Sequence, residues 1–121
     1  MAEIFIAGNV PSSKNGKRWT GKYLIHSKTV MNYIKNTKQD WIQNKEKFQK
    51  LIKNKEVPYK IEFTFIRNSK RKFDYINPCQ TAQDLMVTYD YIEDDNCECI
   101  IPSFGEYKYD KENSGVKIKV L

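Results

Sequence analysis

One stretch of the chain decides the fold class: Tyr59-Lys60-Ile61-Glu62-Phe63-Thr64-Phe65, directly after Pro58. Its large apolar side chains occupy every second position, and polar side chains fill the positions between them. Successive side chains of a β-strand point to opposite faces of a sheet, so this alternation predicts a strand with one buried face. Such a face needs further strands beside it and helices packed over it.

Shorter runs on both sides of this stretch predict the rest of the sheet. The composition of residues 3–7 predicts an opening strand, and residues 22–25 predict a second, short one. Residues 8–21 are basic and rich in Pro, Ser, Asn and Gly, which predicts a polar loop between these two strands. Two closing strands are predicted at 97–104 and 115–120, with a loop at 110–115.

Two segments have the periodicity of helices. The first follows Ser27, a favoured N-cap residue, and its apolar side chains face away from a lysine-rich side. The apolar positions are Val30, Ile34, Thr37, Trp41, Phe48 and Ile52. The pattern weakens at residues 43–45, which predicts a kink or a break there.

The second helix is predicted at 78–88, with Asn77 as its N-cap and Pro78 in its first position. Its core face consists of Ala82, Leu85 and Met86. At about 100° per residue, Asn77, Gln80 and Asp84 fall together on roughly the opposite side. These elements predict a single α+β domain over residues 1–121, with a small mixed β-sheet packed against two helices.

Composition sets the cellular setting that we expect. No run approaches the roughly 20 apolar residues of a membrane helix, and residues 1–4 lack the basic start and apolar stretch of a signal peptide. The three cysteines, Cys79, Cys97 and Cys99, are an odd set without the spacing of a zinc site. We therefore expect a cytoplasmic protein with reduced thiols and no membrane partner.

Charge is distributed unevenly along the chain. Residues 1–72 hold 17 Lys and Arg against 5 Asp and Glu, whereas residues 73–121 hold 4 against 10. A basic half favours a polyanionic partner, most commonly nucleic acid. The candidate DNA-binding residues are Lys14, Asn15, Lys17, Arg18, Arg67, Lys70, Arg71 and Lys72. The alternative is that these lysines are ordinary solvated surface charge.

The acidic half contains a possible metal site, at Asp74, Asp84, Asp94 and Asp95. Mg²⁺ takes oxygen ligands, and it assists phosphodiester hydrolysis by activating water and neutralising developing charge. Aspartates after a basic strand therefore suit metal-dependent strand cleavage. Each has a structural alternative as well: Asp74 could cap the helix, Asp84 could be surface, and the last two could form a solvated turn.

The order and spacing of these motifs resemble the RusA family of crossover junction endonucleases. The matching segments are Lys70-Arg71-Lys72-Phe73-Asp74-Tyr75-Ile76-Asn77, Asp84-Leu85-Met86 and Ile92-Glu93-Asp94-Asp95. The segment Val10-Pro11-Ser12-Ser13-Lys14-Asn15 is similar to a Pro-Ser-x-Asn loop of that family. The resemblance extends over nearly the whole chain, and its elements are specific in combination rather than singly.

This resemblance implies a homodimer that binds four-way (Holliday) junctions or related branched DNA in recombination or repair. Such proteins nick symmetric strands with Mg²⁺, are often encoded by phages or prophages, and act in the host cytoplasm. Carried over by position, Asp74 is the first metal aspartate, Asp94 and Asp95 form the distal metal-binding turn, and Asp84 is the helical catalytic aspartate.

Two positions depart from the family pattern. Ile76 stands where a second metal aspartate is expected, and Gln80 stands where a catalytic lysine is expected. Either the site is rebuilt around the four aspartates, with Asn77 assisting and Mn²⁺ accepted, or the chain is a non-catalytic DNA-binding or regulatory module. A third hypothesis, independent of the family, is a basic nucleic-acid-binding domain whose acidic residues are incidental.

Overall fold

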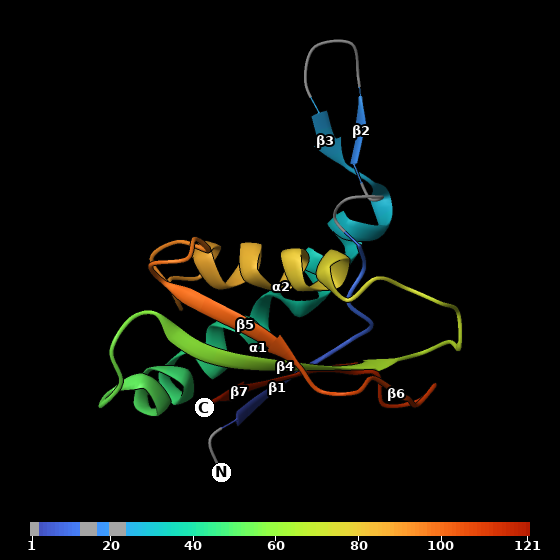
Figure 1. Ribbon diagram of the computed structural model, residues 1–121. Helices are drawn as coiled ribbons and strands as arrows, with labels where there is room; N and C mark the ends of the chain where they lie inside the picture. The colour runs from blue at the N-terminus through green and yellow to red at the C-terminus, as the bar shows by residue number, and fades with distance from the viewer. Residues whose placement is uncertain (1–2, 13–16, 20–23) are drawn as a thin grey trace.

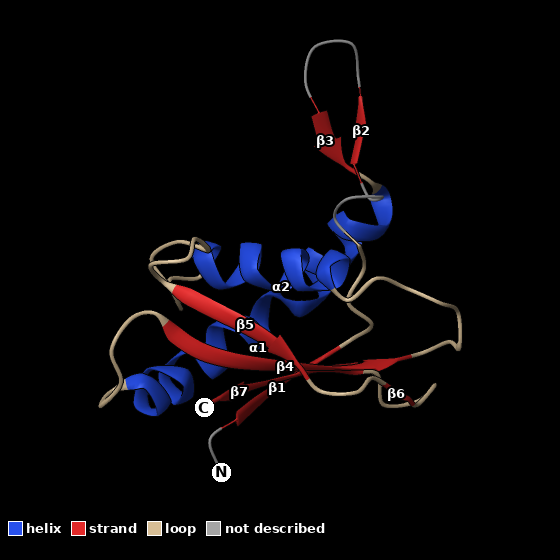
Figure 2. Ribbon diagram, viewed as in Figure 1, coloured by secondary structure: helices blue, strands red, loops and turns tan. Residues whose placement is uncertain are grey.

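The central sheet is built around the strand that the alternating stretch predicts. The computed structural model describes residues 3–12, 17–19 and 24–121. The elements are β1 (Glu3–Ala7), β2 (Lys17–Trp19), β3 (Leu24–His26), α1 (Lys28–Ile52), β4 (Tyr59–Arg67), α2 (Ile76–Thr88), β5 (Ile100–Phe104), β6 (Lys108–Tyr109) and β7 (Gly115–Val120). They form the α+β domain that the sequence predicts, with a mixed sheet and two helices (Figures 1 and 2).

The sheet order explains how α2 comes to lie over the sheet. The main path runs β1-β7-β4-β5, and β6 pairs with the far end of β4. Strand β7 is antiparallel to β1 and β4, whereas β5 is parallel to β4. Parallel neighbours need a crossover rather than a tight turn, and α2 lies in this crossover. The helix therefore runs back from the end of β4 towards the start of β5 (Figure 1).

The core lies on one face of the sheet. Ile61, Phe63 and Phe65 of β4 are fully buried, and every second residue of β1 and β7 is buried with them. Both helices contribute to the same apolar cluster, with Trp41 and Phe48 from α1 and Ala82, Leu85 and Met86 from α2. The predicted core face of the second helix is confirmed.

Helix α1 is longer and more regular than its sequence pattern indicates. Ser27 is the N-cap, as predicted, and its hydroxyl accepts a hydrogen bond from the Val30 N–H at 3.4 Å. The predicted break at 43–45 is wrong, because the helix continues without interruption to Ile52. Trp41 and Phe48 lie two turns apart and both are buried, so packing holds the helix across the polar segment.

Several strand predictions need correction. The strand predicted at 97–104 begins only at Ile100, because Cys97–Cys99 lie in a turn in which the Cys99 and Ile100 N–H groups bond to the Asn96 carbonyl. The loop predicted at 8–21 contains β2, which pairs with β3 as a hairpin projecting beside the start of α1 (Figure 1). Strand β6 was not predicted, and only its pairing with Ile66 and Arg67 defines it.

The three cysteines form no disulfide. Cys79, Cys97 and Cys99 are free, and burial raises the pKa of the Cys79 thiol to about 12.

Within the described part of the chain, no helix has the length and apolar character required to cross a membrane.

Candidate functional site

Helix α2 positions the candidate site, and it begins earlier than predicted. Its first residue is Ile76, and Tyr75 occupies the N-cap position without a side-chain cap hydrogen bond. Asn77 is therefore not the N-cap; it lies inside the first turn, and its N–H donates to the Asp74 carbonyl at 3.1 Å. Pro78 also lies in the first turn, where helix N–H groups have no intrahelical partner.

Two carboxylates of the site converge on the side chain of Gln80. Its side-chain nitrogen Nε2 donates to Oδ1 of Asp84 at 2.7 Å and to Oδ2 of Asp95 at 2.9 Å. Gln80 and Asp84 lie one turn apart on the same helix face, as the sequence predicts. Asp95 comes from the turn after α2, so the Gln80 amide bridges the helix and this turn.

Two buried side chains anchor the acidic turn, residues 91–96, to the core. Tyr91 and Ile92 are nearly inaccessible, and the Tyr91 hydroxyl donates to the carbonyl of Trp41 in α1. The Asp94 carboxylate accepts from the Asp95 N–H at 2.8 Å and from the Asn96 amide at 3.2 Å. Asp94 thus stabilises the turn, while Asp95 faces Gln80 on α2.

Asp74 lines a polar cavity of about 280 Å³ at the start of α2. The cavity is lined by Ser12, Arg67, Lys72, Phe73, Asp74, Asn77 and Pro78. Arg67 is half-buried, donates to the Val10 carbonyl at 2.7 Å and lies 4.4 Å from the Phe73 ring centroid. Burial lowers the pKa of its guanidinium, which still carries a positive charge because arginine is effectively always protonated in proteins. The cavity therefore combines a carboxylate with two cations.

The aspartates do not form one tight cluster. Among residues 3–12, 17–19 and 24–121, no three His, Cys, Asp or Glu side chains gather closely enough to hold a metal ion. Hydrogen bonds bring Asp84 and Asp95 together through Gln80, whereas the Asp94 carboxylate bonds within its own turn and Asp74 lines the neighbouring cavity. Two carboxylates still fit Mg²⁺, which is commonly held by one or two carboxylates with water and phosphate oxygens.

Ile76 lies at the surface. Its side chain is 68% exposed, so it does not pack inside a site rebuilt around other ligands. Its position as the first residue of α2 is favourable for a carboxylate, because the helix dipole is positive there.

We expect the exchange Ile76→Asp to leave the free energy of unfolding unchanged within about 0.5 kcal/mol, or slightly raised. The buried Ile100, only 2% exposed, is the matched control: Ile100→Asp should unfold the protein or destabilise it by several kcal/mol, since it buries a charge. Urea denaturation measures both. An equally large loss of stability in the two variants would show that Ile76 is packed in solution.

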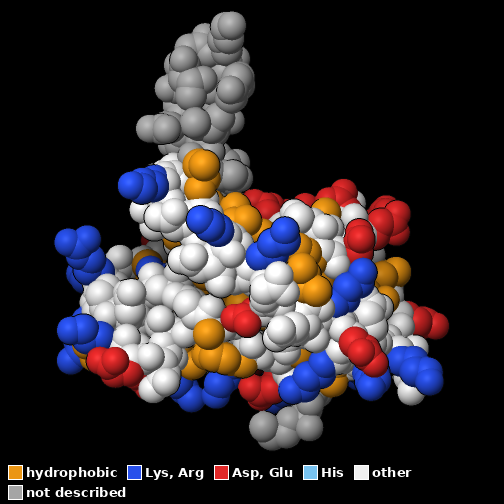
Figure 3. All heavy atoms as spheres, turned by 180° about the vertical axis from the view of Figure 1, so that it is seen from behind, with side chains coloured by type: hydrophobic (Ala, Val, Ile, Leu, Met, Phe, Trp, Pro, Cys, Tyr) orange, Lys and Arg blue, Asp and Glu red, His pale blue; other side chains and the backbone are white. Residues whose placement is uncertain are grey.

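The predicted DNA-binding residues divide into four groups. Arg67 is the last residue of β4 and lines the Asp74 cavity. Lys70, Arg71 and Lys72 are exposed in the loop between β4 and α2. Lys17 and Arg18 lie on β2, whereas Lys14 and Asn15 fall outside the described residues. On the face seen in Figure 3, Lys and Arg side chains are spread over the surface, and acidic side chains gather at one upper edge. The lysines on this face are therefore best interpreted as solvated surface charge.

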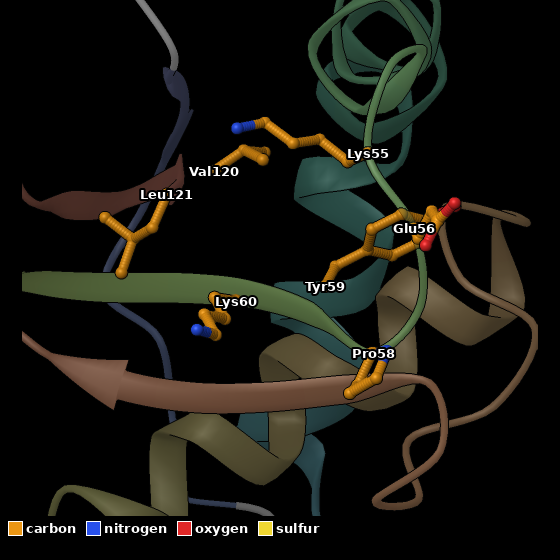
Figure 4. Close-up of a pocket in the computed structure, with 7 residues that line it drawn as sticks. All are labelled: Lys55, Glu56, Pro58, Tyr59, Lys60, Val120 and Leu121. Atoms are coloured by element: carbon orange, nitrogen blue, oxygen red, sulfur yellow. The ribbon is translucent and has the colours of Figure 1, made fainter.

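A second cavity lies away from the aspartates, near the start of β4 (Figure 4). It measures about 150 Å³ and is lined by Lys55, Glu56, Pro58, Tyr59, Lys60, Val120 and Leu121. The Asp74 cavity includes Arg67, the last residue of β4, so the two cavities lie at opposite ends of this strand. The cavity of Figure 4 is not part of the candidate site.

Two features of the site were not found from the sequence. Gln80 was identified only as a departure from the family pattern, although its spacing to Asp84 already placed the two on one helix face. The packing of Phe73 with Tyr75 and Tyr107 was missed altogether. The sequence does show the aromatic residues. It does not show that they meet, because Tyr107 is more than 30 residues from the other two and reaches them only in the folded sheet.

No protein-family profile matches the chain, and no curated protein sequence matches it significantly.

Proposed function

We propose that this protein is a metal-dependent endonuclease that binds and nicks four-way junctions or related branched DNA, as members of the RusA family do. The observation that carries the proposal is the convergence of Asp84 and Asp95 on one nitrogen of Gln80, within 2.9 Å. Carboxylate oxygens are among the ligands that Mg²⁺ and Mn²⁺ prefer. The basic loop 70–72 precedes the same helix and supplies charge for a phosphate backbone.

Each site residue has a distinct role in this proposal. Asp84 and Asp95 would hold the ion, which when bound activates water and neutralises charge on the phosphate. Gln80 orients the two carboxylates through hydrogen bonds. Asp94 fixes the acidic turn. Asp74, with Asn77 beside it in the neighbouring cavity, would add a ligand or orient a water once DNA is bound.

Metal titration tests this assignment. We expect Mg²⁺ or Mn²⁺ to bind the wild type, and Asp95→Asn and Asp84→Asn to weaken binding more than Asp74→Asn does. Calorimetry with each ion alone provides the affinities. Equal affinity in all four proteins would contradict the assignment of the metal to this pair.

A non-catalytic DNA-binding module is the second candidate function. It is favoured by the hydrogen bonds of Gln80, which occupy one oxygen of each carboxylate without a metal. The exchange Ile76→Asp, alone or with Gln80→Lys, restores residues typical of the family. A weakened enzyme should gain cleavage of a four-way junction from this restoration, whereas a pure binding module should gain none.

The basic loop should determine the salt dependence of DNA binding. Replacing Lys70, Arg71 and Lys72 with Ala should flatten the slope of log affinity against log salt by about 0.9 for each phosphate that the loop no longer neutralises. Fluorescence anisotropy with a labelled junction measures this slope. The control replaces three exposed lysines of α1, Lys35, Lys38 and Lys47, by Ala. If both triple variants keep the wild-type slope, the loop residues are ordinary surface charge.

A homodimer is part of the proposal, because symmetric nicks in a four-way junction require two equivalent sites. Light scattering at micromolar concentration, with and without junction DNA, should give the mass of two chains. A monomer mass under both conditions would contradict this part alone.

A further inference from the structure

Aromatic side chains gather near the ends of β4 and β5, beside the candidate site. Phe73 lies 5.1 Å from Tyr75 and 5.3 Å from Tyr107 between ring centroids, and Tyr75 lies 5.2 Å from Phe104. The Tyr107 N–H also donates to the Tyr75 hydroxyl at 3.0 Å. The rings come from two segments, residues 73–75 before α2 and residues 104–107 at the end of β5, which the fold brings together.

This group of rings, which we call the aromatic patch, is open to solvent on one side. Phe104 and Tyr107 are each 36% exposed, and Tyr109, in the adjoining β6, is 44% exposed. Single exposed aromatic residues are normal, but an exposed group of them marks a site of interaction. Packing on Phe73 and the main-chain contact with Tyr75 limit the freedom of Tyr107, so little entropy is lost when a flat partner stacks on it.

Cations border the aromatic patch. Arg67 lies over the Phe73 ring, and Lys70 Nζ lies 5.1 Å from the Tyr109 ring centroid. Four cations fall within residues 67–72, and no acidic residue lies among them. The carboxylate of Asp110, next to Tyr109, accepts hydrogen bonds from the Glu112 and Asn113 N–H groups. Flat rings beside a basic segment match a nucleic acid strand, whose bases stack while its phosphates follow the cations.

We propose that Tyr107 and Tyr109 form a stacking surface for unpaired nucleobases, with Lys70, Arg71 and Lys72 holding the adjacent phosphates. This inference rests on the proposed function for its partner, DNA, but it does not require cleavage. Bases at a branch point unstack more readily than bases within a duplex, so the surface would favour branched over linear DNA. The alternative occupant is a second copy of this chain.

The test compares ring removal in the aromatic patch with ring removal elsewhere. Tyr107→Leu and Tyr109→Leu keep apolar bulk but lose the flat ring, whereas Tyr107→Phe keeps it. Phe5→Leu is the matched control, because Phe5 is 40% exposed on β1 at the opposite edge of the sheet. Binding is measured in EDTA with a single-stranded oligonucleotide and with a four-way junction carrying 2-aminopurine at the branch point. Thermal unfolding confirms that each variant is folded.

We expect each Leu variant to lose about fivefold or more in affinity for the single strand, as removal of one stacking ring does. The 2-aminopurine signal, quenched by the wild type, should recover in the Leu variants and stay quenched with Tyr107→Phe and Phe5→Leu. Unchanged affinity and quenching in both Leu variants would overturn the proposal. If Tyr107→Leu instead halves the mass of the protein in solution while DNA binding persists, the patch is a self-association surface and the proposal is also wrong.

These outcomes are separate from those of the proposed nuclease. If the protein binds single strands through Tyr107 but never cuts a junction with Mg²⁺ or Mn²⁺, the stacking proposal stands and the nuclease proposal fails. If the protein cuts junctions with Mg²⁺ or Mn²⁺ while affinity and quenching are unchanged in both Leu variants, the nuclease proposal stands and the stacking proposal fails.

Discussion

Asp95→Asn is expected to reduce cleavage of a four-way junction by about 100-fold or more, while the protein stays folded and continues to bind DNA. Asp95 points a carboxylate oxygen at the same nitrogen as Asp84, and the amide that replaces it carries no charge. A bound metal contributes several kcal/mol of charge stabilisation to phosphodiester cleavage, and each 1.4 kcal/mol corresponds to about a tenfold change in rate. Single-turnover cleavage of labelled junction DNA in Mg²⁺ measures the reduction.

The matched control for this prediction is Asp90→Asn, the same chemical change five residues earlier. Asp90 is exposed and has a φ of 62°, a left-handed conformation that Asn also adopts readily. Its carbonyl accepts a hydrogen bond from the Gln49 amide of α1 at 3.2 Å, a main-chain contact that the exchange preserves. Cleavage by this variant should therefore stay at the wild-type rate. If Asp95→Asn also cuts at the wild-type rate, the Asp84–Asp95 pair does not hold the catalytic metal.

Trp41→Ala is expected to lower the free energy of unfolding by about 3–5 kcal/mol, the usual cost of deleting a large buried aromatic side chain. Trp41 is fully buried, and its indole N–H donates to the Thr37 hydroxyl at 3.2 Å. The ring also packs edge-on against Tyr91, with centroids 5.5 Å apart. This contact joins α1 to the acidic turn, so the variant should bind metal more weakly too.

Urea denaturation followed by far-ultraviolet circular dichroism measures the stability of this variant. The control is Ile42→Ala on the neighbouring position of α1, where the side chain is 47% exposed and the change should stay within about 0.5 kcal/mol. A small effect of Trp41→Ala, similar to that of Ile42→Ala, would contradict the packing of α1 against the acidic turn.

The sequence predicts elements well where one face of an element is consistently apolar. In β4 the alternation of Ile61, Phe63 and Phe65 is uninterrupted, and the strand follows the prediction closely. The supposed break in α1 shows the opposite case. The polar residues 43–45 weaken the local pattern, but the buried side chains on either side keep the helix continuous, and Asn44 merely donates to the Asp40 carbonyl.

Pairing between distant segments lies beyond local patterns. Strand β6 has only two residues, and their extended conformation depends on hydrogen bonding to the end of β4. The turn at Cys97–Cys99 likewise depends on main-chain bonds to the Asn96 carbonyl, which no side-chain pattern reveals. The start of α2 was misplaced because Asn77 and Pro78 both suit a helix beginning, and the helix in fact begins slightly before them.

The candidate site was predictable in part. Helical spacing alone placed Gln80 and Asp84 on one face of α2. The contribution of Asp95 depends on the path of the acidic turn, which is set by the burial of Tyr91 and Ile92 and by the hydrogen bonds of Asp94. That path is a tertiary property, so the sequence could not distinguish Asp95 from its neighbour as the residue that faces the helix.

Incubation of the purified wild-type protein with a synthetic four-way junction tests the central claim most directly. The reactions contain Mg²⁺, Mn²⁺ or EDTA, and denaturing electrophoresis detects the cut strands. We predict nicks at symmetric positions with Mg²⁺ or Mn²⁺ and none with EDTA, and more nicking by the Ile76→Asp, Gln80→Lys double variant. Tight junction binding without any cleavage, by the wild type and by the double variant in every divalent metal, would contradict the nuclease function.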